Sequence, residues 1–159
     1  MTCTVRQAGP RDRAWIETQM RQYWGGLVIW SRGVPHNVLE CPTLIAETEG
    51  APCGLLAYLP SPPECEIIVV DARPQFRGTG SKLIEAVVAR ARDVRCSRLW
   101  LVTTNDNVDA LRFYQRRGFV LSRLYRGVVD EARKLKPTIP VIGCYGIAIH
   151  DEIEVERPV

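Results

Sequence analysis

The chain has 159 residues, which suits one compact domain, and 46% hydrophobic and 25% charged residues, a composition typical of globular proteins. A net charge of +3, without any run of five Lys or Arg residues, argues against a nucleic-acid-binding or membrane-surface protein. No segment approaches the roughly 20 apolar residues that span a bilayer, and the N-terminus lacks an apolar signal segment. We therefore expect a cytoplasmic protein.

The six cysteines stand singly, without any Cys-x-x-Cys pair, and most lie among apolar neighbours. This spacing indicates neither a zinc site nor a disulfide framework. We expect reduced thiols that pack as small hydrophobic groups, no bound metal and no cysteine in the chemistry.

Hydrophobic spacing predicts a strand over residues 2–7 and a helix that carries Trp15 and Met20 and ends at Gly25-Gly26. Residues 24–40 mix aromatic residues with Gly and Pro and show no sustained period. We interpret them as a shaped surface loop or short helix that selects the substrate.

Two strands are expected at residues 43–48 and 53–59, joined by the hairpin signal Glu49-Gly50-Ala51-Pro52. After the break Pro60-Ser61-Pro62-Pro63, residues 64–71 form a nearly continuous apolar run. Such a run is typical of a central strand that is buried on both faces.

From Gly80 onward, apolar residues recur at helical spacing and predict an amphipathic helix. The remaining elements are expected to be a strand at 98–103, a helix from 108 that ends at Gly118, a strand at 119–125, a charged helical segment at 130–135 and a last strand at about 146–155. Meander strands followed by helix-connected strands predict one α/β domain, residues 1–159, with a mixed sheet.

The turn Gln75-Phe76-Arg77-Gly78-Thr79-Gly80 lies between the central strand and the amphipathic helix. Glycines there allow backbone N–H groups to face outward, and the helix dipole adds positive potential, so the turn can bind an anion. A nucleotide P-loop needs Lys at the position of Thr79, and a dinucleotide fold needs a third Gly at the position of Leu83. Both readings fail.

Two motifs resemble those of the general-control-type N-acetyltransferase (GNAT) superfamily. They are Gln75-x-x-Gly78-x-Gly80 and Asn107-x-x-Ala110-x-x-Phe113-Tyr114-x-x-x-Gly118-Phe119. The resemblance covers about residues 4–125, and the tail is similar to that of a bacterial subgroup of small acetyltransferases. It implies a mixed, mostly antiparallel central sheet flanked by helices, with a cofactor cleft between two splayed central strands.

The resemblance also implies that acetyl-CoA is the co-substrate. Backbone amides after Gln75 would hold its pyrophosphate, the strand before the turn would pair with its pantetheine arm, and Asn107 would bond to that arm. The cofactor residues implied in this way are Val70, Ala72, Gln75, Arg77, Gly78, Thr79, Gly80, Ser81, Asn107 and Ala110. Arg77, Lys82, Arg112 and Arg116 are candidates for the ribose phosphate, or ordinary solvated side chains.

Amine acetylation needs an acceptor for the amine proton and a donor for the leaving thiolate. Tyr114 matches the tyrosine of the family motif and is the candidate donor, with a core aromatic as the alternative. Glu66 is the candidate base, because strand alternation places it on one face with Ile68 and Val70; Glu64 or a water chain are the alternatives. His36 and His150 are not assigned to the site, and Tyr23, Trp24 and Trp30 either floor an acceptor pocket or belong to the local core.

We thus expect an acetyl-CoA-dependent N-acetyltransferase that acts on an amine of a small molecule or a protein. The alternative is a catalytically silent acyl-CoA-binding sensor on the same fold. No nucleic-acid or membrane partner is expected, a homodimer is a further option, and the identity of the acceptor does not follow from the sequence.

Overall fold

The computed structural model describes residues 2–75 and 77–159, so Phe76 of the predicted cofactor turn lies outside the described residues. The chain divides into two compact units. Unit 1 comprises Met1–Ile29, His36–Leu99 and Val159, and unit 2 comprises Trp30–Pro35 and Trp100–Pro158. The single domain expected from the sequence stays a prediction.

Unit 1 contains a meander of four strands, each antiparallel to its neighbour, in the order β1-β4-β5-β6. The strands are β1 (Cys3–Gln7), β4 (Thr43–Thr48), β5 (Ala51–Ser61) and β6 (Glu64–Ala72). The helices are α1 (Arg13–Trp24) and α2 (Thr79–Asp93), with the 3-10 turns η1 (Pro10–Asp12) and η2 (Val38–Glu40). These elements confirm the predicted strands and helices of this part of the chain.

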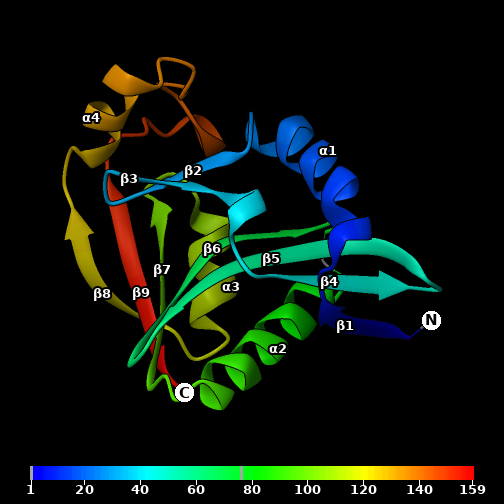
Figure 1. Cartoon of the computed structure of the whole chain (residues 1–159). Coiled ribbons are helices and arrows are strands. Elements are labelled where there is room, and N and C mark those ends of the chain that lie inside the picture. The colour runs from blue at the N-terminus through cyan, green and yellow to red at the C-terminus, as the bar shows by residue number, and fades with distance from the viewer. Residues whose placement is uncertain (1, 76) are drawn as a thin grey trace. The chain divides into compact units, whose positions relative to one another are not determined.

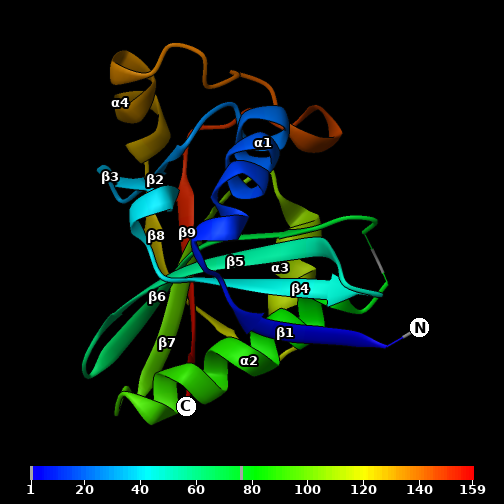
Figure 2. The ribbon, with the colours of Figure 1, turned by 45° about the vertical axis from the view of Figure 1, so that its right-hand side comes forward.

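Helices α1 and α2 cover opposite faces of the β1-β4-β5-β6 meander, as Figures 1 and 2 show. On one face, Ile16 and Met20 of α1 pack in a core with Ile45, Leu55, Ala57, Ile68 and Val69. On the other, α2 buries the apolar residues predicted from its spacing, Leu83, Ile84, Val87, Val88 and Ala91. The meander is therefore buried on both faces.

Residues 24–40 were expected to be a shaped surface loop or short helix; they include the short 3-10 turn η2, but strand structure was not predicted there. They contain a two-stranded hairpin, β2 (Val28–Ser31) and β3 (Val34–Asn37). The two turn residues Arg32 (φ 52°) and Gly33 (φ 78°) both have positive φ, as the favoured two-residue hairpin turns require. Strands of four residues are too short to give a sustained alternation.

In unit 2, the strands β7, β9 and β8 are neighbours in that order, and β8 and β9 are antiparallel. Its elements are β7 (Arg98–Thr104, whose first two residues belong to unit 1), α3 (Val108–Gln115), β8 (Val120–Tyr125), α4 (Val128–Leu135), the 3-10 turn η3 (Cys144–Gly146) and β9 (Glu152–Pro158). The last strand begins six residues later than the predicted 146, because residues 143–146 form a turn in which Tyr145 has a φ of 57°.

The structure is a mixed α/β fold with a mostly antiparallel sheet flanked by helices, which confirms the predicted fold class. The cofactor cleft between splayed strands stays a prediction. Among the described residues, no helix has both the length and the apolar character needed to cross a membrane.

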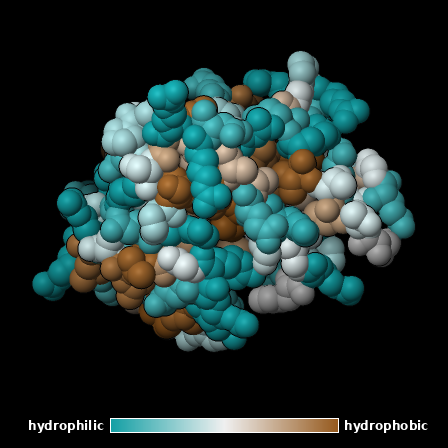
Figure 3. Space-filling view, turned by 90° about the horizontal axis from the view of Figure 1, so that it is seen from below, coloured by the Kyte–Doolittle hydropathy of each residue, from teal (hydrophilic) through white to brown (hydrophobic). Residues whose placement is uncertain are grey.

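Strand β8 exposes large hydrophobic side chains: Val120, Leu121 and Leu124 are each more than half exposed. β8 is the last strand in the order β7-β9-β8, so within the described residues its outer edge pairs with no further strand. Figure 3 shows one face of the molecule, where hydrophobic residues reach the surface between hydrophilic ones. An open apolar edge suits another copy of the chain, but the homodimer stays a prediction.

An ion-pair network joins the start of the chain to β4. Arg6 donates to both carboxylate oxygens of Asp12 at 2.7 and 2.8 Å and to Glu47 at 2.7 and 2.9 Å. The buried Asp12 also accepts from the backbone N–H of Gly9 at 2.8 Å. The hydrogen bonds from Arg6 are the main cause that lowers the pKa of Asp12 to about 2.

This network predicts a loss of stability in acid. A carboxyl group whose pKa is lower in the folded state stabilises the fold above its ordinary pKa of 3.8, and that contribution is lost as the pH falls towards about 2. The shift corresponds to roughly 2 kcal/mol. Chemical denaturation at pH 7 and pH 2.5 should show this loss in the wild type and much less of it in Asp12→Asn. The exposed Asp93→Asn is the control, and an equal acid loss in both variants would contradict the prediction.

Candidate active site

Strand β6 contains a bulge at Ile68. In the pairing with β5, Ile67 lies opposite Tyr58 and Val69 lies opposite Ala57, so Ile68 has no partner in β5. Glu66, opposite Leu59, therefore shares a face with Val69, whereas Val70, opposite Leu56, lies on the other face. The prediction that Glu66 and Val70 share a face is wrong, because the extra residue reverses the alternation.

Glu66 is nearly buried, with 11% of its side chain exposed, and the Nε2 atom of His36 lies 4.0 Å from its Oε2 atom. His36 comes from β3 and is itself 16% exposed. His36 was not assigned to the site from the sequence, because a lone histidine in a loop is seldom catalytic; nothing local to residue 36 indicates that β3 carries it to the side of Glu66. The structure thus adds an imidazole to the candidate base.

Glu64 differs from Glu66 in its surroundings. It lies at the start of β6, its side chain is 48% exposed, and it pairs with Arg98 at 3.2 Å. An exposed, cation-paired carboxylate is less suited to take a proton from a bound amine. Of the two candidates, Glu66 has the more enclosed position.

The start of α2 has the character of an anion site. Gly78 is the N-cap residue, with a φ of 82° that favours glycine, and no side chain caps the helix. The first turn contains no acidic residue, and the exposed side chains of Arg77 and Lys82 add positive charge nearby. The first backbone N–H groups of a helix have no partner within it, so this end attracts an anionic group.

Gly54 of β5 fixes where α2 begins. A Cβ atom at Gly54 would lie 2.9 Å from the Thr79 side chain, 3.0 Å from the Asp71 carbonyl oxygen and 3.2 Å from the Leu83 side chain. Only glycine allows this approach of the helix to the strand. This role of Gly54 was not predicted, although a glycine inside a strand pattern is a signal of close backbone approach.

Asp71, at the end of β6, is buried and joins α1 to the turn. The indole Nε1 of Trp24 donates to Asp71 at 3.3 Å, and Arg73 pairs with the same oxygen at 3.0 Å. The guanidinium of Arg73 also stacks 3.9 Å from the ring centre of Tyr23. Tyr23 and Trp24 therefore anchor the first residues after β6, and their role as a pocket floor stays a prediction.

In unit 2, Asn107 is the N-cap of α3 and its side-chain oxygen accepts from the backbone N–H of Ala110 at 3.1 Å. This bond uses the carbonyl of the Asn107 amide and leaves its NH₂ group as a donor. Asn107 can therefore donate to a carbonyl group of a ligand while it caps the helix. Ala110 contributes its backbone amide to the cap.

Tyr114 of α3 is buried, at 8% exposure, and packs edge-to-face against Phe113 and Phe119 at ring distances of 5.0 and 5.4 Å. Burial raises the pKa of Tyr114 well above its ordinary value, so the phenol is protonated throughout the neutral range. None of the residues in 2–75 and 77–159 forms a hydrogen bond with its hydroxyl group. The group is thus a protonated donor available to a ligand.

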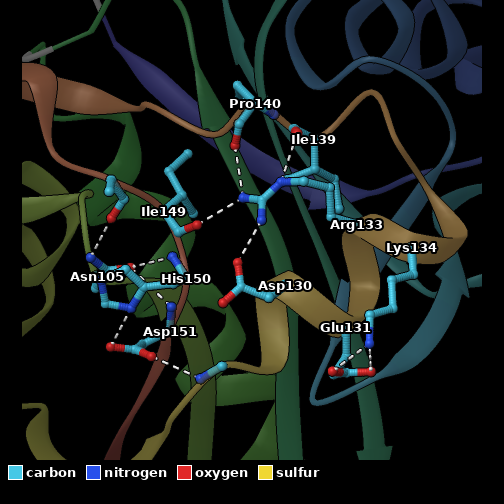
Figure 4. A network of polar contacts seen from close by, with 12 residues as sticks. Asn105, Asp130, Glu131, Arg133, Lys134, Ile139, Pro140, Ile149, His150 and Asp151 are labelled. Atoms are coloured by element: carbon cyan, nitrogen blue, oxygen red, sulfur yellow. Dashed lines mark hydrogen bonds and ion pairs between the residues drawn. The ribbon is translucent and has the colours of Figure 1, made fainter.

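A polar network fixes the segment before β9, as Figure 4 shows. The side chain of Asn105 donates to the Ala148 carbonyl at 2.8 Å and accepts from the N–H groups of His150 and Asp151 at 3.1 and 3.0 Å. Arg133 of α4 holds the same segment by donating to the carbonyl groups of Ile139, Pro140 and Ile149 and to Asp130. The start of β9 is thereby held to the end of β7.

The predicted site residues fall into two groups. Unit 1 contains Glu66, Val70, Ala72, Gln75, Arg77, Gly78, Thr79, Gly80 and Ser81, and unit 2 contains Asn107, Ala110 and Tyr114. The first group combines a carboxylate with an anion-binding helix end; the second combines an amide donor with a protonated phenol. Across the described residues, no three His, Cys, Asp or Glu side chains are grouped so that they could hold a metal.

The close contact at Gly54 gives a prediction. Gly54→Ala should lower the free energy of unfolding by about 1 to 3 kcal/mol, because α2 must move away from β5. Gly9→Ala is the control, since a Cβ atom there meets nothing within 4 Å and the backbone is extended. Urea titration of both variants measures the difference, and a Gly54→Ala protein as stable as wild type would show that the contact is unimportant.

Comparison with known proteins identifies relatives. The profile of the Acetyltransferase (GNAT) family matches residues 11–119. The uncharacterized protein YxbD of Bacillus subtilis (strain 168) is 41% identical over 158 residues, 96% of this chain and 92% of YxbD. YdhI of the same organism is 41% identical over 100 residues, 63% of this chain and 62% of YdhI, so the match spans less than two thirds of that protein. The spermine/spermidine N(1)-acetyltransferase of Bacillus subtilis (strain 168) is 35% identical over 51 residues, which are 31% of this chain and 34% of that enzyme.

Solved structures share the fold. An acetyltransferase of Bacillus subtilis in complex with CoA matches with a TM-score of 0.73 and 15% identity, covering 99% of both chains. A GNAT family acetyltransferase of Elizabethkingia anophelis with acetyl-CoA bound matches with a TM-score of 0.72 and 17% identity, covering 99% of this chain and 98% of that one. The fold, the profile match and the identity to YxbD lead to one conclusion. The chain belongs to the acetyltransferase (GNAT) family.

Proposed function

We propose that this protein is an acetyl-CoA-dependent N-acetyltransferase that transfers the acetyl group directly to an amine of a small molecule or a protein. The observation that carries the proposal is Tyr114, a buried and protonated phenol whose hydroxyl has no protein partner within residues 2–75 and 77–159. The ring is buried while the hydroxyl is not among the buried unpartnered atoms of the described residues, so it is accessible and can donate to a ligand. The named relative that acetylates spermine and spermidine supports an amine acceptor.

Each unit, taken by itself, offers groups that suit a part of acetyl-CoA. The α2 start at Gly78 suits the pyrophosphate, the Asn107 NH₂ group suits an amide carbonyl of the pantetheine arm, and β6 offers backbone at Val70 and Ala72. Two solved relatives of the same fold hold CoA or acetyl-CoA. When bound, acetyl-CoA supplies an activated acetyl thioester.

On the acceptor side, Glu66 would take the proton from the attacking amine, either directly or through a water molecule. His36, 4.0 Å away, would stabilise the carboxylate or relay the proton. A backbone N–H at the bulge of β6, near Val70, would polarise the thioester carbonyl, because a bulge interrupts the regular strand pairing.

On the leaving-group side, Tyr114 would donate its proton to the sulfur. The new bond joins the amine nitrogen to the acetyl carbon, and the carbon–sulfur bond breaks with its electron pair on sulfur. The amine proton goes to Glu66 and the sulfur receives the tyrosine proton, so the step is balanced. The raised pKa of Tyr114 keeps that proton in place at neutral pH.

Thiol release from acetyl-CoA in the presence of a panel of amines tests this proposal. Tyr114→Phe should lower kcat by about 100-fold or more while the KM for acetyl-CoA changes little, because only the proton donor is lost. The exposed Tyr145→Phe is the control. If none of the amines in the panel is acetylated although acetyl-CoA binds tightly, the result would instead support a catalytically silent acyl-CoA sensor.

The choice between Glu66 and Glu64 can be tested on the same strand. Glu66→Gln should lower kcat by about 100-fold, because a general base typically contributes this much. His36→Asn should lower kcat less, because His36 would act through Glu66. Glu64→Gln is the matched control, since its exposed carboxylate pairs with Arg98. If Glu64→Gln were as slow as Glu66→Gln, the assignment of Glu66 would be wrong.

A further inference from the structure

We infer that Asp71 and Arg73 are positioning residues for the binding of acetyl-CoA. With Tyr23 and Trp24 they hold the end of β6 to the end of α1, and so fix the backbone that leads to the proposed pyrophosphate site at Gly78. We call these four side chains the Asp71 anchor, and all of them belong to unit 1, as Gly78 does. The inference rests on the proposed N-acetyltransferase function, because it assigns the residues that prepare its cofactor turn.

Asp71 lies on the face of β6 that α1 covers. Its partner in β5 is Leu55, which packs in the core under α1 together with Val69 of β6. Asp71 is only 4% exposed, so a carboxylate takes the place of an apolar side chain at the end of this core. A well-packed apolar residue is often at least as stabilising as a buried ion pair, so stability alone does not account for the carboxylate.

Three donor atoms converge on one oxygen of Asp71. The indole Nε1 of Trp24, the last residue of α1, donates to Oδ1 at 3.3 Å. Arg73 approaches the same oxygen with Nε at 3.2 Å and Nη2 at 3.0 Å. The Asp71 carboxylate therefore bridges the last residue of α1 and the first residue after β6.

The guanidinium of Arg73 faces α1. It lies 3.9 Å from the centre of the Tyr23 ring, and Asp71 balances its charge. Tyr23 belongs to the last turn of α1, where the helix dipole adds negative potential that favours a cation. Arg77, in contrast, has an exposed side chain beside the start of α2. Arg73 therefore acts on the course of the chain rather than on a bound anion.

The turn before α2 lies between two fixed points. Before the turn, the backbone N–H of Arg73 donates to the Cys53 carbonyl at 2.9 Å, so both its main chain and its side chain are held. After the turn, the Thr79 side chain packs so closely on Gly54 that a Cβ atom there would lie 2.9 Å from it. A turn that is held at both ends loses less conformational freedom when it binds a ligand, which raises its affinity.

Calorimetric titration of CoA into the purified full chain tests the role of Asp71. Asp71→Asn keeps the size of the side chain and an oxygen for the Trp24 indole, but it removes the charge that holds Arg73. The Kd for CoA should rise about tenfold, the order that a hydrogen bond to a charged group contributes. Asp93→Asn neutralises an exposed carboxylate at the end of α2; it is the charge-matched control and should keep the wild-type Kd.

The direction of the change separates positioning from direct binding of the anion. If Arg73 were an anion ligand restrained by Asp71, Asp71→Asn would release the guanidinium and lower the Kd for CoA. A Kd that falls, or one that stays at the wild-type value, would therefore overturn the inference.

A second variant tests the anchor without a change of charge. Trp24→Phe removes the indole N–H at a position that is 37% exposed, so this variant remains informative if Asp71→Asn fails to fold. The Kd for CoA should rise several-fold, and the titration contains no acceptor, so a contact of Trp24 with an acceptor cannot contribute. Trp15→Phe, the same substitution in the same helix, is the control. An unchanged Kd in Trp24→Phe would also overturn the inference.

Two acetyl donors separate positioning from a general loss of structure. Acetyl-CoA contains the pyrophosphate, whereas S-acetyl-N-acetylcysteamine carries the same acetyl thioester without it. Asp71→Asn should lower kcat/KM about tenfold for acetyl-CoA, mainly through a higher KM, and should leave the value for the short donor nearly unchanged. An equal loss with both donors would show that Asp71 only stabilises the fold.

Binding and turnover together separate this inference from the proposed function. If the Kd for CoA depends on Asp71 and Trp24 as expected but no amine is acetylated, the proposed function fails and the anchor stands. If amines are acetylated while both variants bind CoA like the wild type, the function stands and the anchor is wrong. If the wild type does not bind CoA, both proposals fail.

Discussion

In unit 1, the bulge residue Ile68 determines which side chains of β6 lie on each face of the strand. Glu66 lies on the face shared with Val69 and α1, and Val70 lies on the face covered by α2. Regular alternation would have placed both on one side, with the carboxylate among the groups expected to line the cofactor. The bulge lets one buried strand present a carboxylate to one side and backbone for a ligand arm to the other.

The periodic elements could be predicted from the sequence, because local spacing determines them. Strands β4 to β6 and helices α2 and α3 begin and end close to the predicted residues, where apolar alternation, helical spacing and capping residues agree. The β2–β3 hairpin and the start of β9 could not be predicted. Their formation depends on pairing between short segments and on bonds from Asn105, which no local pattern reveals.

The candidate site also combines features that local sequence determines with features that depend on remote contacts. The helix starts at Gly78 and Asn107 follow from residue types at fixed offsets, and the structure describes both as N-cap residues. Gly54, His36 and the bulge at Ile68 act through neighbours that are remote in sequence or through a change of register. The contacts of Arg32 are more remote still, since Arg32, Trp100 and Glu154 meet only after unit 2 has folded.

Arg32 occupies the tip of a two-residue turn, with a solvent-exposed side chain and Gly33 beside it. Its guanidinium nevertheless stacks on the buried Trp100 and lies 3.9 Å from the buried Glu154, so a substitution at this surface turn acts on the interior of unit 2. Sequence change at one exposed turn can therefore alter the packing and charge balance inside unit 2, while the glycine turn before α2 in unit 1 keeps its own sequence and backbone.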